Sequence, residues 1–249
     1  MVMKIALICR GRTNSTAIGK SLAANKNLEW VGENYFWFHE ELVRWLHYRP
    51  KYDKTLAFKK FTEIIKDETY KISLQDNFVI KIFPSILHFP PSLMFENTSF
   101  ESVKNDFIFD TNLIKLNTYD QYYFLDRNFR YSTLSWIYAF QTSQFHQPKI
   151  NKRNYYKITL NKTDFARTKF YIIEYLMQQK MRKYLENNKI PFTLIDESCY
   201  SDYIDNTKLG TEKTSINYEH YIENIKELDS FIDYWYPICE QETSNWNFY

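Results

Sequence analysis

Residues 10–16 gather the side chains best suited to binding an anion. Two cations stand within three positions, and hydroxyl and amide groups follow them. In order the residues are Arg10, Gly11, Arg12, Thr13, Asn14, Ser15 and Thr16. Guanidinium groups and hydroxyls are the usual partners of phosphate oxygens, so the chemistry that this segment predicts is phosphate binding.

A second candidate phosphate site follows an aromatic strand near the middle of the chain. The strand is QYYFL, residues 121–125, and it ends at Asp126-Arg127. Arg127 offers a planar fork to a phosphate, and Ser135 lies eight residues later in a segment with helical spacing. Ser132 is the close substitute for Ser135 if the loop has another shape.

The first site requires a strand, a loop and a helix in immediate succession. Residues 4–9 form an apolar run that predicts a buried strand, and residues 16–25 predict a helix. The first amide groups of a helix lack intrahelical acceptors and carry the positive end of the helix dipole. A strand that leads into such a helix directs these amides at a ligand beyond its carboxyl end.

Strand and helix patterns alternate along the rest of the chain. Strands are expected at residues 77–83, 121–125 and 191–195, and helices at 55–66, 130–141 and 163–187. Such alternation favours a three-layer α/β fold, with a mainly parallel sheet of about four or five strands flanked by helices. With no internal repeat and no clear linker, we expect one domain spanning residues 1–249.

Composition narrows the function classes. The chain of 249 residues carries a net charge of +2, which implies no broad field for nucleic acid or membranes, so any anion site must be local. We expect a cytoplasmic protein without membrane insertion, because no apolar run is long enough for a signal peptide or a membrane span. Cys9, Cys199 and Cys239 lack metal-ligand spacing, so we expect reduced, buried thiols and no metal.

Both phosphate motifs resemble those of a known family. Residues 12–16, Arg-Thr-Asn-Ser-Thr after the strand KIALIC, resemble the 5′-phosphosulfate loop of sulfotransferases that use 3′-phosphoadenosine 5′-phosphosulfate (PAPS); bacterial members carry Arg-Ser-Gly-Ser-Thr there. Asn14 replaces the family glycine, a tolerable change because Asn reaches positive φ at modest cost. The segment from Arg127 to Ser135 resembles the 3′-phosphate motif, with Phe129 where the family usually has Pro.

The resemblance implies the sulfotransferase variant of the P-loop NTPase-like architecture and a set of residue roles. PAPS would be the cofactor, adenosine 3′,5′-bisphosphate its product, and no metal would be required. Arg12 would stabilise the leaving phosphate, and Arg127 and Ser135 would hold the 3′-phosphate. Lys213 lies where family members close a basic loop over the nucleotide, although a solvated loop is the more common setting for such a lysine. The 5′-phosphate cradle would comprise Arg10, Gly11, Arg12, Thr13, Asn14, Ser15 and Thr16.

The catalytic base departs from the pattern of many cytosolic members. They place a His in Lys-x-His-Leu-Pro on the second strand, whereas this chain reads Lys81-Ile82-Phe83-Pro84. Glu33, followed by an aromatic run, resembles the base of the carbohydrate-sulfotransferase branch, and His39 is the second candidate. The acceptor would be a hydroxyl of a carbohydrate or another small molecule. Lys81 is a candidate either for contact with the sulfuryl group or for capping its strand.

Two other functions are compatible with the same residues. Gly19-Lys20-Ser21 suggests a P-loop kinase of nucleotides or small molecules, but its loop would need glycine at Asn14, and Lys20 falls about two turns into the expected helix. A non-catalytic relative that binds an anion or glycan is the other alternative. Binding of PAPS rather than ATP with magnesium separates the kinase from the other two, and turnover separates enzyme from binder. The sequence does not indicate the oligomeric state.

Overall fold

A computed structural model describes residues 3–10, 13–31, 76–82, 100, 119–142, 155–204 and 216–246. The described strands are β1 (Lys4–Ile8), β2 (Glu29–Trp30), β3 (Phe78–Ile82), β4 (Gln121–Leu125) and β5 (Thr193–Ile195). The described helices are α1 (Ser15–Lys26), α6 (Phe129–Thr142), α7 (Lys162–Asn187), α8 (Tyr200–Tyr203) and α10 (Ile225–Ser244), with the 3-10 helices η4 (Glu197–Cys199) and η5 (Tyr218–Tyr221).

The five strands form one sheet in the order β2-β3-β1-β4-β5, and every pairing is parallel. This confirms the expected parallel α/β fold. The central strand β1 has the sequence KIALI, and the apolar side chains on both of its faces are buried. Parallel strands covered on both faces read as continuous apolar runs, which is why this segment was recognisable from sequence.

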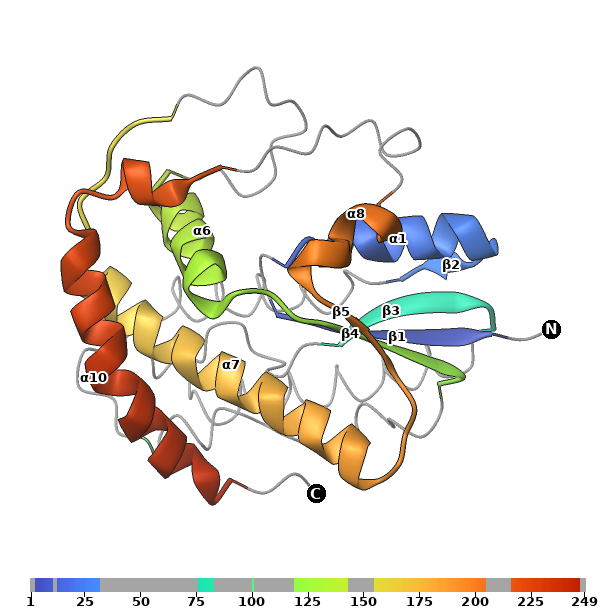
Figure 1. The fold of residues 1–249 in the computed structure, drawn as a ribbon. Helices are drawn as coiled ribbons and strands as arrows, with labels where there is room; N and C mark the ends of the chain where they lie inside the picture. Colours follow the sequence, from blue (N-terminus) through green and yellow to red (C-terminus); the bar gives the residue numbers. More distant parts are fainter. Residues whose placement is uncertain are drawn as a thin grey trace, which may run out of the picture.

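Helices cover both faces of the sheet (Figure 1). Ile5 and Leu7 of β1 pack with α1 and with Tyr200 of α8, whereas Ala6 and Ile8 pack on the opposite side. There the carboxyl half of α7 covers the strands. The result is a three-layer arrangement, with α6, α10 and the amino half of α7 forming a further core beside the sheet.

The connections after β1 and β4 leave on opposite faces of the sheet. The chain after β1 enters α1 on one face, and the connection from β4 to β5 passes through α6 and then α7 on the other (Figure 1). β1 and β4 are neighbours, with Ile8 paired to Phe124. In open α/β sheets, ligands bind outside the carboxyl ends of the strands at such a switch point.

Local contacts explain how the two helices nearest the switch point are fixed. A Cβ at Gly19 would lie 2.0 Å from Cζ3 of Trp30, so α1 approaches β2 more closely than any larger residue would allow. α7 begins with a capping box: the side chain of Asn161 accepts from the backbone N–H of Asp164, whose carboxylate accepts from that of Asn161.

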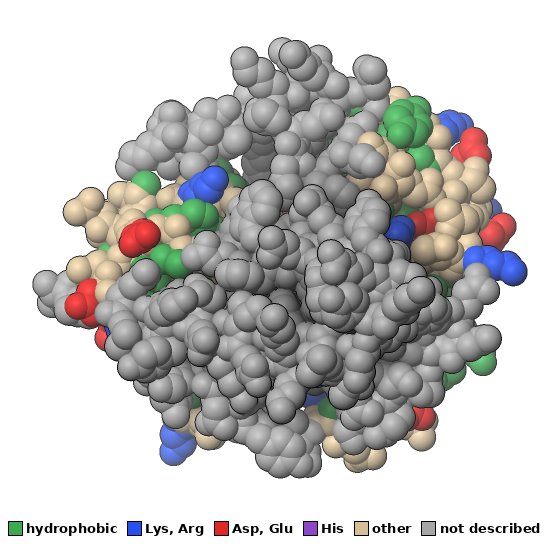
Figure 2. All heavy atoms as spheres, turned by 180° about the vertical axis from the view of Figure 1, so that it is seen from behind, with side chains coloured by type: hydrophobic (Ala, Val, Ile, Leu, Met, Phe, Trp, Pro, Cys, Tyr) green, Lys and Arg blue, Asp and Glu red, His purple; other side chains and the backbone are tan. Residues whose placement is uncertain are grey.

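The described surface carries charges of both signs, as the net charge of +2 implies. Figure 2 shows basic and acidic side chains interspersed among the described residues at the margins of one face. Among the described helices, none is long and apolar enough to cross a membrane.

Candidate functional site: the carboxyl ends of β1, β3 and β4

The loop after β1 enters α1 through a left-handed residue, Asn14. Asn14 lies in the left-handed region, with φ 55° and ψ 17°, which confirms that Asn takes the positive φ expected at this position. The hydroxyl of Thr13 donates to the backbone oxygen of Arg10 at 2.7 Å and so fixes the turn. The loop is therefore folded back on the end of its strand.

The first turn of α1 presents its amide groups beyond that loop. The first helical bond runs from the N–H of Ile18 to the oxygen of Asn14 at 3.0 Å, and the Asn14 side chain makes no capping hydrogen bond. The amides that precede Ile18 in this turn point away from the body of the helix, as the first amides of any helix do. Together with the helix dipole they favour an anion at this end.

Lys81 brings a cation to the same helix end. It pairs with Leu7 in the sheet, on the face that α1 covers, and its Nζ donates to Oγ1 of Thr16 at 2.8 Å. The side chain is 7 % exposed. A buried ammonium and the positive end of a helix dipole repel one another, so an anion bound between them would relieve that repulsion.

Arg127 follows the neighbouring strand β4. Its Nε donates to Oε1 of Glu197 at 3.0 Å, and its guanidinium lies over the ring of Tyr131, 4.3 Å from the centroid. The side chain of Arg127 is 11 % exposed, and that of Glu197 is 42 % exposed. A carboxylate of η4, just after β5, thus reaches the arginine of the second motif.

Ser132 and Ser135 lie one turn apart on α6, and both are buried. Residues three apart on a helix share a face. Ser132 donates its hydroxyl proton to the backbone oxygen of Phe129 at 2.9 Å and accepts a hydrogen bond from Arg10. Ser132 thus serves the internal structure, and the role of Ser135 as a 3′-phosphate ligand stays a prediction from the sequence.

Arg10 lies inside the protein rather than at the rim of the cradle. Its side chain is 3 % exposed. Nε donates to Oε1 of Gln178 at 2.6 Å, one Nη donates to Oγ of Ser132 at 3.0 Å, and the other donates to the backbone oxygen of Arg127 at 3.1 Å. Burial lowers the pKa of Arg10, while the nearby charge of Glu174 acts in the opposite direction. The Arg10 guanidinium therefore connects the two phosphate motifs by hydrogen bonds inside the protein.

The structure does not describe five of the predicted site residues. Gly11, Arg12, Glu33, His39 and Lys213 lie outside the described residues. Their roles stay predictions from the sequence.

Gln178 and Glu174 are the site residues that the sequence reasoning did not identify. Both are buried on α7, four residues apart, on a helix whose inner side was expected to be apolar. The amide of Gln178 also donates to the backbone oxygen of Leu125 at 2.6 Å. A pair of polar residues spaced four apart in an apolar stripe was the available signal.

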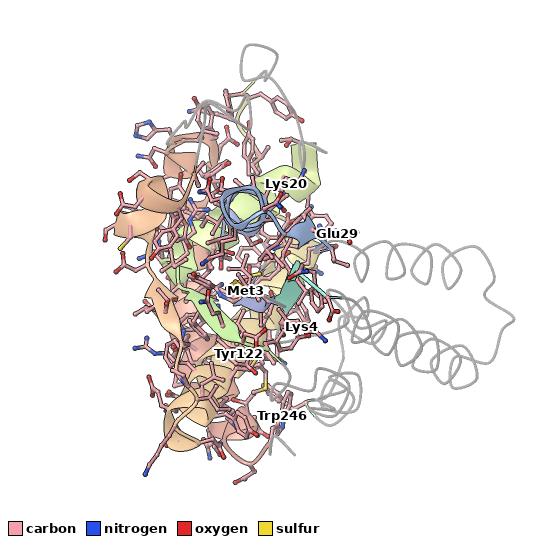
Figure 3. The ribbon with its side chains drawn as sticks, turned by 90° about the vertical axis from the view of Figure 1, so that its right-hand side faces the viewer. Met3, Lys4, Lys20, Glu29, Tyr122 and Trp246 are labelled. Atoms are coloured by element: carbon pink, nitrogen blue, oxygen red, sulfur yellow. The ribbon has the colours of Figure 1, made fainter. Side chains whose placement is uncertain are left out.

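The structure places Lys20 away from the position that the kinase alternative requires. Lys20 lies in the second turn of α1 and is exposed, whereas a P-loop lysine has to reach the phosphates at the helix start. Figure 3, in which α1 is seen end-on, shows Lys20 on that helix, away from Lys4 and Tyr122 of the sheet. Gly19, which would form the kinase motif with it, serves instead to pack α1 against Trp30.

The cysteines differ from the expectation at one position. Cys9 and Cys239 are buried free thiols, but Cys199 is half-buried, and its Sγ donates to Oδ1 of Asp196 at 3.4 Å. It begins the turn from η4 into α8, where the chain runs along the surface. Burial raises the pKa of Cys9 to about 11 and that of Cys239 to about 12. Within the described ranges, no three His, Cys, Asp or Glu side chains are grouped to hold a metal.

Comparison with known proteins gives no independent assignment, since neither the protein-family models nor the curated proteins contain a match to this chain.

Proposed function

We propose that the chain binds PAPS and transfers its sulfuryl group to an acceptor hydroxyl. The observation that carries the proposal is the physical link between the two phosphate motifs. Thr13 bonds the backbone of Arg10, and Arg10 in turn bonds the backbone of Arg127 and the hydroxyl of Ser132. Motifs more than a hundred residues apart in sequence thus meet at one edge of the sheet.

Each half of the arrangement suits a different phosphate. The 5′-phosphosulfate would sit at the first turn of α1, near the ammonium of Lys81, where helix amides and a cation come together. The 3′-phosphate would take its charge partner from Arg127, whose side chain is ordered by Glu197 and Tyr131. The parallel sheet with an anion loop after its central strand also supports the sulfotransferase variant of the P-loop architecture.

The chemical step would need few groups. The acceptor oxygen attacks the sulfur, the bond from sulfur to the 5′-phosphate oxygen breaks, and negative charge develops on that phosphate. Cations and amides directed at this oxygen stabilise it, as in other oxyanion sites. The acceptor proton passes to a base, for which the sequence offers Glu33 first and His39 second. The acceptor class, a carbohydrate or other small molecule, comes from the sequence alone.

A thermal-shift comparison of nucleotides tests the binding half of the proposal. Adenosine 3′,5′-bisphosphate at a hundredfold over its dissociation constant should stabilise the fold by about 2.7 kcal/mol. For a chain of this length the melting temperature should rise by roughly 5–11 °C. AMP should give a much smaller rise. Equal shifts for both nucleotides, or none, would remove the main support, and binding without turnover would favour the non-catalytic alternative.

A further inference from the structure

The Arg10 guanidinium donates hydrogen bonds to three separate segments of the chain near the switch point. Its acceptors belong to α7, to the first turn of α6 and to the backbone after β4. The ring of Tyr175, also on α7, lies 4.9 Å from its guanidinium carbon. A planar fork can satisfy several acceptors at once, which an ammonium at the same place cannot do.

The backbone of the same residue begins the first phosphate loop. Thr13 folds back onto the carbonyl of Arg10, so residues 13–16 and the Arg10 side chain are parts of one turn. Gln178 extends the link, because it accepts from Arg10 and donates to the carbonyl of Leu125, the last residue of β4. A movement of either loop therefore strains hydrogen bonds that the other loop depends on.

Because Arg10 is buried, its set of hydrogen bonds is either intact or broken. The Arg10 side chain is almost fully enclosed, so a lost acceptor is not replaced by bulk water. Packed cores with such polar contacts take discrete arrangements rather than deforming gradually.

We propose that Arg10 is a positioning residue that couples residues 13–16 of the loop after β1 to residues 126–132 of the loop after β4 and the start of α6, so that each phosphate of a bound nucleotide orders the loop that holds the other. The part of this inference that concerns phosphates rests on the proposed function. The part that concerns the loops does not, since it follows from contacts within the protein alone.

Hydrogen exchange of the ligand-free protein tests the link directly. Arg10→Lys keeps the charge but loses the fork. It should speed amide exchange about tenfold in both loops, read at the N–H of Ile18 and at the N–H of Ser132, which bond the backbone oxygens of Asn14 and Asn128. Arg130→Lys is the matched control. Arg130 lies in the first turn of α6, but it bonds Asp229 and Glu219 on the side of α10 and η5, so its variant should leave exchange at Ile18 unchanged.

Two outcomes would overturn the inference: faster exchange in only one of the two loops of the Arg10→Lys protein, or the same pattern in both variants. If Arg10→Lys does not fold, Gln178→Met provides the same test. It removes one acceptor of Arg10 and the donor to Leu125, and both loops should then exchange about threefold faster.

A nucleotide cycle then tests the coupling of the two phosphates. Dissociation constants are measured for adenosine, AMP, adenosine 3′-phosphate and adenosine 3′,5′-bisphosphate. In the parent, the two phosphates together should improve affinity at least about fivefold more than the product of their separate effects, and in Arg10→Lys this excess should vanish. An unchanged excess contradicts the inference. If no nucleotide binds the parent, the proposed function fails, while the exchange experiment still decides the role of Arg10.

Discussion

Nε of Arg127 lies 3.0 Å from Oε1 of Glu197, so the guanidinium that follows β4 is held by a carboxylate that follows β5. The carboxylate is partly exposed, and exposed ion pairs contribute little net stability. Tyr131 supports one face of the same guanidinium. Arg127, whose own side chain is 11 % exposed, is thus held in a defined orientation beside the carboxyl end of β4.

Arg127→Ala should weaken binding of adenosine 3′,5′-bisphosphate by about 2–5 kcal/mol, because it removes a charged partner of a bound phosphate. AMP affinity should change far less. Arg182→Ala is the control, since Arg182 also pairs with a glutamate, Glu186, but on the outer part of α7. Calorimetry that finds the Arg127 variant binding like the parent would remove this residue from the site.

Lys81→Met should weaken AMP and adenosine 3′,5′-bisphosphate alike, by about 1.5–3 kcal/mol, because it deletes a charged donor at the 5′ end of the site. Methionine keeps the length and apolar character of the buried stem. Lys20→Met is the matched control, because Lys20 is the lysine that the kinase alternative requires. This variant should bind both nucleotides like the parent. Titration of both variants distinguishes the sulfotransferase from the kinase. A loss of nucleotide affinity in Lys20→Met with none in Lys81→Met would favour the kinase.

Glu33→Gln should lower turnover by about 10²–10⁴ with little change in nucleotide affinity, because the amide keeps the shape of the side chain and cannot accept the proton. Initial rates with an identified acceptor provide the measurement, and His39→Ala is the comparison. Should Glu33→Gln retain full turnover while His39→Ala loses it, the base is His39. If both retain it, neither residue is the base.

The buried thiol of Cys9 should contribute to loss of stability at alkaline pH. Its pKa is raised to about 11 by burial, so the unfolded chain releases this proton at lower pH than the folded protein. The contribution is fully present below about pH 9 and is lost as pH rises toward 11, by up to about 3 kcal/mol. Denaturant titrations between pH 8 and 11 should show a shallower decline for Cys9→Ala. An identical decline in both proteins would contradict this.

Part of the fold was predictable because the central strands β1 and β3 are buried on both faces. The runs KIALI and QYYFL carry their apolar character without help from distant residues, and the structure places strands at Lys4–Ile8 and Gln121–Leu125. The strand β2, only two residues long, is too short to show a periodic pattern in the sequence. Its pairing with β3 depends on a partner about fifty residues away, which a local pattern does not contain.

The candidate site was predictable at Asn14 and unpredictable at Arg10. The left-handed conformation of Asn14 follows from a local backbone preference. Whether Arg10 faces solvent or the interior depends instead on Gln178, more than 160 residues later in the chain. The sequence predicted Arg10 as a member of the 5′-phosphate cradle, whereas the structure shows its guanidinium bonded inside the protein.

A crystal structure with adenosine 3′,5′-bisphosphate bound is the most direct test of the proposed nucleotide site. The account predicts the 5′-phosphate at the amides of Ser15 and Thr16, within reach of Nζ of Lys81. It predicts the 3′-phosphate within hydrogen-bond distance of the guanidinium of Arg127. A nucleotide bound elsewhere, or bound with its 3′-phosphate away from Arg127, would contradict the central claim.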